Sequence, residues 1–145
     1  MFPGYFSADA STGHYFTRPE LYNRDRPLFK KYVPLCRLVA EADWEPVTGA
    51  RSDNAAVTLE RFGWQPGLCY LTVYNQSEAR QRAVVTLTAL AQPSACRDLV
   101  RDAAVMWQER RTAVELDAGD VCVLAFTGPY AGDVLVEDVR VQEVK

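Results

Sequence analysis

At 145 residues the chain can form one ordinary domain with an appendage, and it is too short for two independent hydrophobic cores. Hydrophobic residues make up 48% of it and aromatic residues 11%, a composition that excludes intrinsic disorder. The formal charge of −3 is a small difference between 16 basic and 19 acidic residues, which are mixed along the chain. Neither nucleic acid nor an anionic membrane is therefore expected as a partner.

The N-terminal part predicts an aromatic-rich loop followed by one amphipathic helix. Residues 1–23 mix Gly, Ser, Asp, Thr and aromatic residues without a helical or strand period. In residues 26–42 the apolar positions recur every three or four residues, as on one face of a helix. Asp25 is the expected N-cap, and Pro27 then falls in the first turn. Because Pro34 lies inside the pattern, we expect a kink or a restart of the helix there.

After residue 52 the apolar period changes to two, which predicts a series of short β-strands. Turns rich in Gly, Asn, Asp and Pro separate them, and the first two strands are expected to form a hairpin. This spacing favours an all-β sandwich or barrel over a parallel sheet, which would need crossover helices. The expected strands are residues 57–62, 68–74, 82–90, 96–100, 104–107, 112–116, 121–126 and 134–144.

The cysteines do not predict a metal site. Cys36, Cys69, Cys96 and Cys122 are far apart, form no CxxC pair, and share the chain with a single histidine. Zinc ligation is therefore not expected, and no other metal or cofactor is predicted. Three of the four lie in apolar, strand-like runs, which favours buried free thiols.

The sequence shows no targeting signal. Its N-terminus has neither the basic region nor the apolar core of a signal peptide, and no apolar run is long enough to span a membrane. A soluble protein of a reducing compartment, cytoplasmic by default, is the expectation. A disulfide framework is the alternative if the chain is secreted.

Several segments carry a resemblance to a known group of proteins. Residues 2–7 (FPGYFS) look like the loop after a final barrel strand, and residues 26–32 (RPLFKKY) look like the helix that follows it. Residues 70–75 (YLTVYN) with 83–87 (AVVTL), and residues 114–124 (VELDAGDVCVL), are similar to strand pairs and closing segments of C-terminal sandwiches. Their order resembles the tail of multi-domain glycoside hydrolases, in which a (β/α)8 barrel precedes a β-sandwich.

The resemblance implies a mainly β fold, an antiparallel β-sandwich preceded by the loop and one helix. Residues 1–52 would be the end of a barrel and residues 53–145 the sandwich domain. In such enzymes the two catalytic carboxylates come from barrel strands, and this chain does not contain those strands. No catalytic residue is therefore expected, and the chain by itself is not expected to be an enzyme, whatever the activity of a parent glycoside hydrolase.

Five residues are candidates for contacting a carbohydrate. His14 and Tyr15 lie in the N-terminal loop, and loops at the C-terminal ends of strands build the sugar site of a complete barrel. Trp64 lies in a predicted turn, where an exposed indole would stack on a sugar ring. Trp107 and Tyr130 have the same two interpretations as Trp64. The alternatives are a structural loop histidine at His14 and, for the others, aromatic rings that cover the edge of the sandwich.

The sequence therefore predicts a non-catalytic accessory domain of a glycoside-hydrolase-like protein. It would act in domain packing or self-association, with the barrel domain of a parent protein or a second copy as partner. The apolar face of the helix, from Leu28 to Val39, is expected to be core, and any uncovered part would drive self-association. The alternative is a carbohydrate-binding module that uses surface aromatic residues. A third possibility is a small hydrolase built from His14 and scattered acids.

Overall fold

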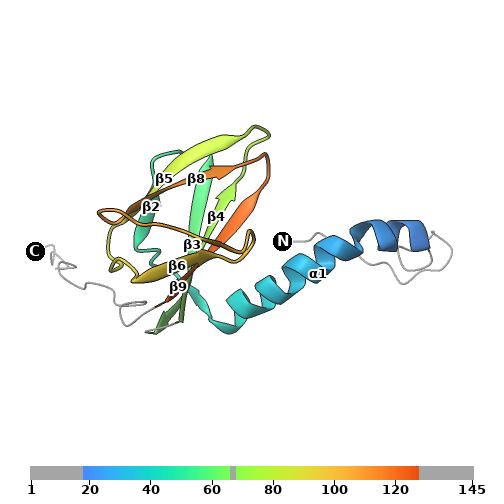
Figure 1. Ribbon diagram of the computed structural model, residues 1–145, viewed down its shortest axis with the longest axis horizontal. Helices are drawn as coiled ribbons and strands as arrows, with labels where there is room; N and C mark the ends of the chain where they lie inside the picture. The colour runs from blue at the N-terminus through green and yellow to red at the C-terminus, as the bar shows by residue number, and fades with distance from the viewer. Residues whose placement is uncertain (1–17, 66–67, 128–145) are drawn as a thin grey trace, which may run out of the picture. The chain divides into compact units, whose positions relative to one another are not determined.

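The computed structural model describes residues 18–65 and 68–127 of the chain (Figure 1). The chain divides into two compact units, Met1–Arg37 and Leu38–Lys145, and each is described by itself. The strand expected at residues 134–144 lies outside the described residues. None of the described helices is long and apolar enough to cross a membrane.

Helix α1 (Pro19–Glu41) begins about two turns before the start that the sequence predicted. Pro19 occupies the first helical position, where its missing N–H removes no helical hydrogen bond. Glu20 places a negative charge in the first turn, which favours a helix N-terminus. The carbonyl of Arg18 accepts the first hydrogen bonds, from the N–H groups of Leu21 at 3.0 Å and Tyr22 at 3.2 Å.

The expected N-cap and first turn were therefore wrong. Asp25 and Pro27 lie inside α1, and the helix continues through Pro34 without a restart. An interior proline removes one backbone hydrogen bond, but the bonds on either side of it can maintain the helix. The apolar period placed the N-terminus too late because residues 23–26 (NRDR) are all polar and separate Leu21 and Tyr22 from the apolar positions that follow.

Most of the apolar face of α1 is exposed and does not form part of a core. Val39 is its one buried residue among those described, whereas half of the Leu28 side chain and 49% of Val33 are exposed. Cys36 is also exposed, contrary to the expected burial. The apolar positions of this helix are thus largely unused by the packing that the structure describes.

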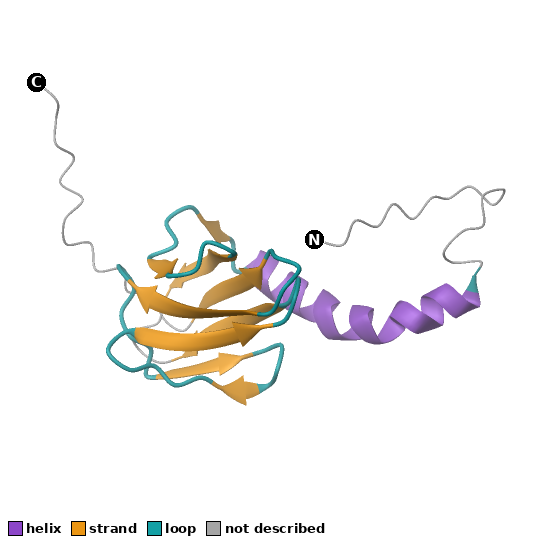
Figure 2. Ribbon diagram, turned by 90° about the horizontal axis from the view of Figure 1, so that it is seen from above, coloured by secondary structure: helices purple, strands orange, loops and turns teal. Residues whose placement is uncertain are grey.

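The rest of the described chain is an antiparallel β-sandwich, as predicted (Figure 2). A six-stranded sheet has the order β1-β3-β4-β9-β6-β7, and a three-stranded sheet has the order β2-β5-β8. The first sheet ends in two-residue strands at both edges, and every pairing is antiparallel. The strands are β1 (Trp44–Glu45), β2 (Ala50–Ser52), β3 (Val57–Gln65), β4 (Leu68–Asn75), β5 (Gln81–Leu87), β6 (Ala95–Asp98), β7 (Ala103–Ala104), β8 (Arg111–Leu116) and β9 (Val121–Thr127).

The core lies between the two sheets and follows from the two-residue period. Alternate residues of a strand point to the same face, so one set of each strand is buried. Leu71 and Val73 of β4 face inward with Val85 of β5 and Phe126 of β9, and each of these four is at most 2% exposed. The core cluster contains residues of the strands and their loops, between residues 57 and 126, and none of α1.

The predicted hairpin is confirmed, because β3 pairs with β4 in antiparallel register. However, β3 does not stop at Gly63. Gly63 adopts a left-handed conformation with φ of +77°, and the register shifts between Phe62 and Gln65. Its N–H donates to the carbonyl of Asp43 at 2.8 Å. A glycine that looked like a strand end is a bulge that lets the strand continue.

Two short strands were missed, and three predicted strands were too long, because β5, β6 and β7 end at Leu87, Asp98 and Ala104 and not at residues 90, 100 and 107. β1 and β2 precede residue 53 and pair with β3 and β5, so strands lie on both sides of the boundary expected at residue 52, which stays a prediction. β5 ends at Leu87, before the expected residue 90. The next three N–H groups donate instead to the carbonyl of Gly49, at 2.8 Å from Thr88, 3.1 Å from Ala89 and 3.3 Å from Leu90.

Candidate functional site

The sequence-predicted candidates are not brought together among the described residues. His14, Tyr15 and Tyr130 lie outside them. Trp64 lies in β3, not in a turn, and its side chain is outside the described part. Sugar contact at these four positions stays a prediction.

Trp107 is in the core and offers no open ring face. Its side chain is 9% exposed and meets Phe126 edge to face, with ring centroids 5.6 Å apart and planes at 83°. Burial raises the pKa of the Cys96 thiol to about 11, and the adjacent Trp107 N–H acts in the opposite direction. Trp107 Nε1 has no hydrogen-bond partner among the described residues. A structural role fits this position better than sugar stacking.

Two acids that follow α1, Asp43 and Glu45, have structural partners among the described residues. Glu45 lies 3.3 Å from the guanidinium of Arg61, which is 2% exposed. Its carboxylate therefore offsets the charge of a buried arginine. Asp43 uses its backbone carbonyl to hold the bulge at Gly63.

All four cysteines lie within the residues that the structure describes. Burial raises the pKa of the Cys69 thiol to about 11 and that of Cys122 to about 12, as it does for Cys96. All four are free thiols, and Cys36 is the exposed one. Within residues 18–65 and 68–127, no group of three or more His, Cys, Asp or Glu side chains is placed to hold a metal ion.

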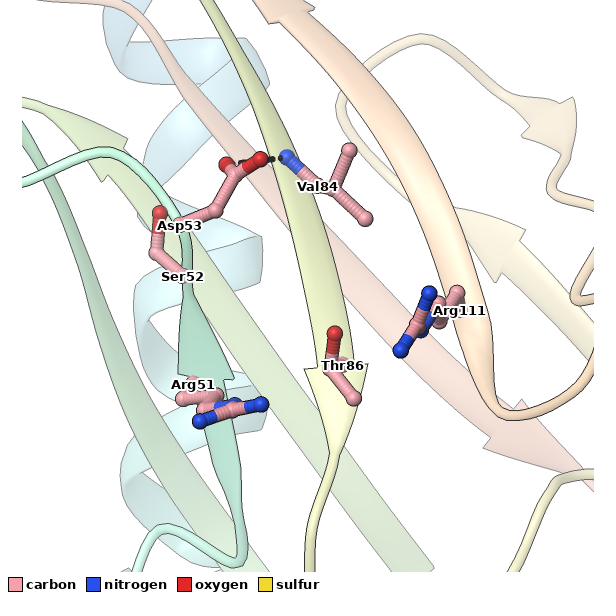
Figure 3. Close-up of a pocket in the computed structure, with 6 residues that line it drawn as sticks. All are labelled: Arg51, Ser52, Asp53, Val84, Thr86 and Arg111. Carbon is pink, nitrogen blue, oxygen red and sulfur yellow. Dashed lines mark hydrogen bonds between the residues drawn. The ribbon is translucent and has the colours of Figure 1, made fainter.

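A shallow depression lies on the outer face of the three-stranded sheet (Figure 3). Its volume is about 420 Å³. It is open to solvent and crosses β2, β5 and the start of β8. The lining residues are Arg51, Ser52, Asp53, Val84, Thr86 and Arg111. We call it the β5 groove.

Strand register sets the centre of the β5 groove. Thr86 of β5 is paired with Arg51 of β2 on one side and with Arg111 of β8 on the other. Val85 and Leu87 point into the core, so Thr86 and its two partners point outward. In Figure 3 both guanidinium groups turn toward Thr86 from opposite sides.

The far end of the β5 groove is acidic. Asp53 Oδ1 accepts the N–H of Val84 at 2.7 Å, which fixes the carboxylate beside the apolar Val84 side chain. Ser52 is occupied locally, because its hydroxyl donates to the carbonyl of Asn54 at 3.0 Å. The groove therefore has a basic end at the two arginines and an acidic end at Asp53, and sequence analysis had singled out none of these residues.

The two arginines of the groove differ from most arginines of the sandwich. Within the described residues, neither the Arg51 nor the Arg111 guanidinium has an ion pair or hydrogen bond, and the same is true of Arg82, which also points outward from β5. The other arginines of the sandwich have partners: Arg61 with Glu45, Arg80 with Glu115 and Asp117, Arg97 with Asp102, Arg101 with Asp98 and Asp120, and Arg110 with the carbonyls of Thr88 and Leu90.

No protein-family model matches the sequence, and no curated protein sequence is significantly similar to it. Among solved structures, the chain is similar to an Anoxybacillus α-amylase, which is described as providing insights into a new glycosyl hydrolase subclass. The sequence identity is 17% and the TM-score is 0.49, over 79% of this chain. The match covers 24% of the α-amylase chain, so this protein spans about a quarter of that length.

Proposed function

We propose that this chain is a non-catalytic β-sandwich module of a glycoside-hydrolase-like protein, and that α1 is its packing surface. The link to glycoside hydrolases rests on the sequence resemblance of its loop, helix and strand segments. The packing role rests on one observation: α1 exposes apolar side chains, and the sandwich core contains no residue of this helix.

A helix of 23 residues with an apolar face is stable in water mainly through what that face packs against. Leu28, Tyr32 and Cys36 follow each other at four-residue steps, so they form one line along α1. Leu28 and Cys36 are exposed, and Tyr32 is partly buried. Burial of this line against a neighbour would contribute roughly 25 cal/mol for each Å² of apolar surface. The neighbour is a domain of the parent protein or a second copy of this chain.

Light scattering on the full chain, with dye binding to exposed apolar surface, tests the proposal. The double variant Leu28→Glu/Cys36→Glu places charges on the line, and Lys30→Glu is the matched control on the opposite side of the helix. If a second copy is the neighbour, wild type and control form dimers and the double variant is monomeric. If the neighbour is another domain, all three are monomers, and only the double variant loses dye binding.

A double variant that matches wild type in both mass and dye binding would contradict the proposal. Circular dichroism on each variant separates this result from loss of the helix, because the β-sandwich and α1 contribute different signals.

A further inference from the structure

We propose that the β5 groove binds an acidic sugar, with its carboxylate or sulfate between Arg51 and Arg111 and a ring hydroxyl at Asp53. This inference concerns the outer face of the three-stranded sheet and goes beyond the packing role of α1. It rests on the register, the charges and the free hydrogen-bonding groups of the groove.

The spacing of the two arginines suits one oxyanion. Arg51 and Arg111 lie on the two strands that flank β5, so their backbones are about 10 Å apart, two strand spacings. Both side chains lean toward Thr86, one from each side (Figure 3). A guanidinium group presents a planar set of N–H donors that matches the oxygens of a carboxylate or sulfate. An oxyanion above Thr86 would thus be within reach of donors from both sides.

The charge pattern also points to a ligand. Two arginines that face one residue repel each other, and neither has a carboxylate partner among the described residues. Asp53 lies on the same face of the chain as Arg51, two residues further on, yet the two side chains form no ion pair in this structure. Its carboxylate is held instead by the N–H of Val84 at 2.7 Å. The two guanidinium groups are therefore available to an anion from outside.

The Asp53 carboxylate favours a sugar acid over an inorganic anion as the ligand of the groove. A phosphate or sulfate ion alone gains nothing from a carboxylate in the same groove. A sugar acid carries an anionic group and hydroxyl donors on one ring, so its hydroxyl can donate to Asp53 while its anionic group meets the arginines. The Thr86 hydroxyl lies between the two arginines and the apolar Val84 side chain lies beside Asp53, and together they match the mixed polar and apolar surface of a sugar ring.

Nucleic acid fits the groove less well. A protein that makes six to ten phosphate contacts uses roughly two to three times as many as the arginines on this face, Arg51, Arg82 and Arg111. Single strands also need aromatic side chains for base stacking, and none lines the groove. The formal charge of the chain, −3, would further repel a dense polyanion.

Isothermal titration calorimetry on the full chain tests the inference with five probes. Trigalacturonate carries carboxylates, a κ-carrageenan oligosaccharide carries sulfate without carboxylate, and maltotriose is the neutral sugar. Sodium sulfate is the inorganic anion, and a single-stranded DNA oligonucleotide is the nucleic acid. Trigalacturonate or the sulfated oligosaccharide is expected to bind, and maltotriose is not. The stronger of the two acidic sugars identifies the anionic group.

Three variants in the groove and one control outside it assign the binding. Arg51→Gln and Arg111→Gln are each expected to weaken binding of the acidic sugar by about tenfold, because each removes charged hydrogen bonds. Arg97→Gln, which removes the same charge from an exposed arginine elsewhere on the sandwich, is expected to change it less than twofold. Thermal unfolding of each variant checks the fold, and Arg51→Lys provides a second, milder change at the same position.

Four results would overturn the inference. They are wild-type affinity in both glutamine variants, equal binding of maltotriose, binding of inorganic sulfate without either acidic sugar, and binding of DNA in preference to the sugars. None of these results depends on the oligomeric state, so failure here leaves the role of α1 unaffected.

Discussion

The side-chain oxygen of Asn75 accepts two hydrogen bonds from Ser77, one from its backbone N–H at 3.0 Å and one from its hydroxyl at 2.8 Å. The amide nitrogen of Asn75 points the other way and donates to the carbonyls of Ala79 and Asp117, both at 2.7 Å, and of Leu116 at 3.3 Å. Asn75 ends β4 in one sheet and Leu116 ends β8 in the other. This fully buried amide therefore links the two layers of the sandwich.

Replacement of Asn75 by alanine should destabilise the sandwich strongly. It removes five hydrogen bonds of a buried side chain, and each such bond contributes about 0.5–1.5 kcal/mol. We expect a loss of about 3 kcal/mol in the free energy of unfolding, measured by urea denaturation. Gln76→Ala is the control, because Gln76 is exposed and makes one bond, to the carbonyl of Ala55 at 3.2 Å. Equal effects in the two variants would contradict this role of Asn75.

Removal of the Arg101 side chain should cost more than removal of Arg97. Arg101 Nη1 lies 2.8 Å from Asp98 Oδ2, whose side chain is 6% exposed, and Arg101 also pairs with Asp120. Arg101→Ala therefore leaves a buried carboxylate unpaired, with an expected loss of about 2 kcal/mol or more. Arg97→Ala breaks an exposed pair with Asp102 and should cost less than about 1 kcal/mol. Guanidinium chloride is unsuitable here because it screens ion pairs, so urea titrations of both variants should be compared.

Gly63 and Gly119 both have positive φ, but replacement by alanine should destabilise the protein to different extents. A Cβ at Gly63 would lie 2.2 Å from the carbonyl oxygen of Leu68, which belongs to the backbone and cannot move away. At Gly119, with φ of +65°, a Cβ would meet nothing within 4 Å. We expect Gly119→Ala to cost about 1 kcal/mol, from backbone strain alone. Gly63→Ala should cost at least twice that and lower the midpoint of thermal unfolding further, and a smaller shift than in Gly119→Ala would refute the bulge geometry.

The buried thiols predict a loss of stability in alkali. Burial raises the pKa of Cys122 from 9.0 to about 12 and those of Cys69 and Cys96 to about 11. Above pH 9 the unfolded chain releases thiol protons that the folded chain retains, so the free energy of unfolding falls as the pH rises. The slope is on the order of 1 kcal/mol per thiol and pH unit, until the pH passes the folded pKa values.

Urea denaturation at pH 8, 9 and 10 measures this slope. Cys122→Ala is expected to reduce the slope by about a third, since it removes one of the three thiols whose pKa is raised by burial. Cys36→Ala is the control, because Cys36 is exposed. An unchanged slope in Cys122→Ala would show that other groups cause the alkaline loss.

The longer strands were predictable from the sequence because burial on one face leaves a visible period. In β4 and β5 every second residue is buried, and both strands were placed to within three residues of their ends. β1 and β2 have two and three residues, too few to show a period. They exist because β3 and β5 offer backbone partners, which is a tertiary effect that the local sequence does not encode.

The groove could not have been predicted in the same way. Arg51 and Arg111 are far apart in the sequence, and only the pairing of β2 and β8 with opposite sides of β5 brings them to Thr86. The sequence did show outward polar positions on alternating strands, but not which strands share a sheet. Surface aromatics were the signal chosen for a binding site, whereas Trp107 is one of the residues that closes the core.

The two-residue edges of the larger sheet have a consequence for how the protein meets other chains. A strand that approached β1 or β7 would find backbone donors and acceptors along only a very short stretch of the described residues. Open sheet edges of greater length are templates for intermolecular β-pairing and fibril growth. At these two edge strands, recognition by backbone addition is therefore disfavoured, and contacts through side chains are favoured.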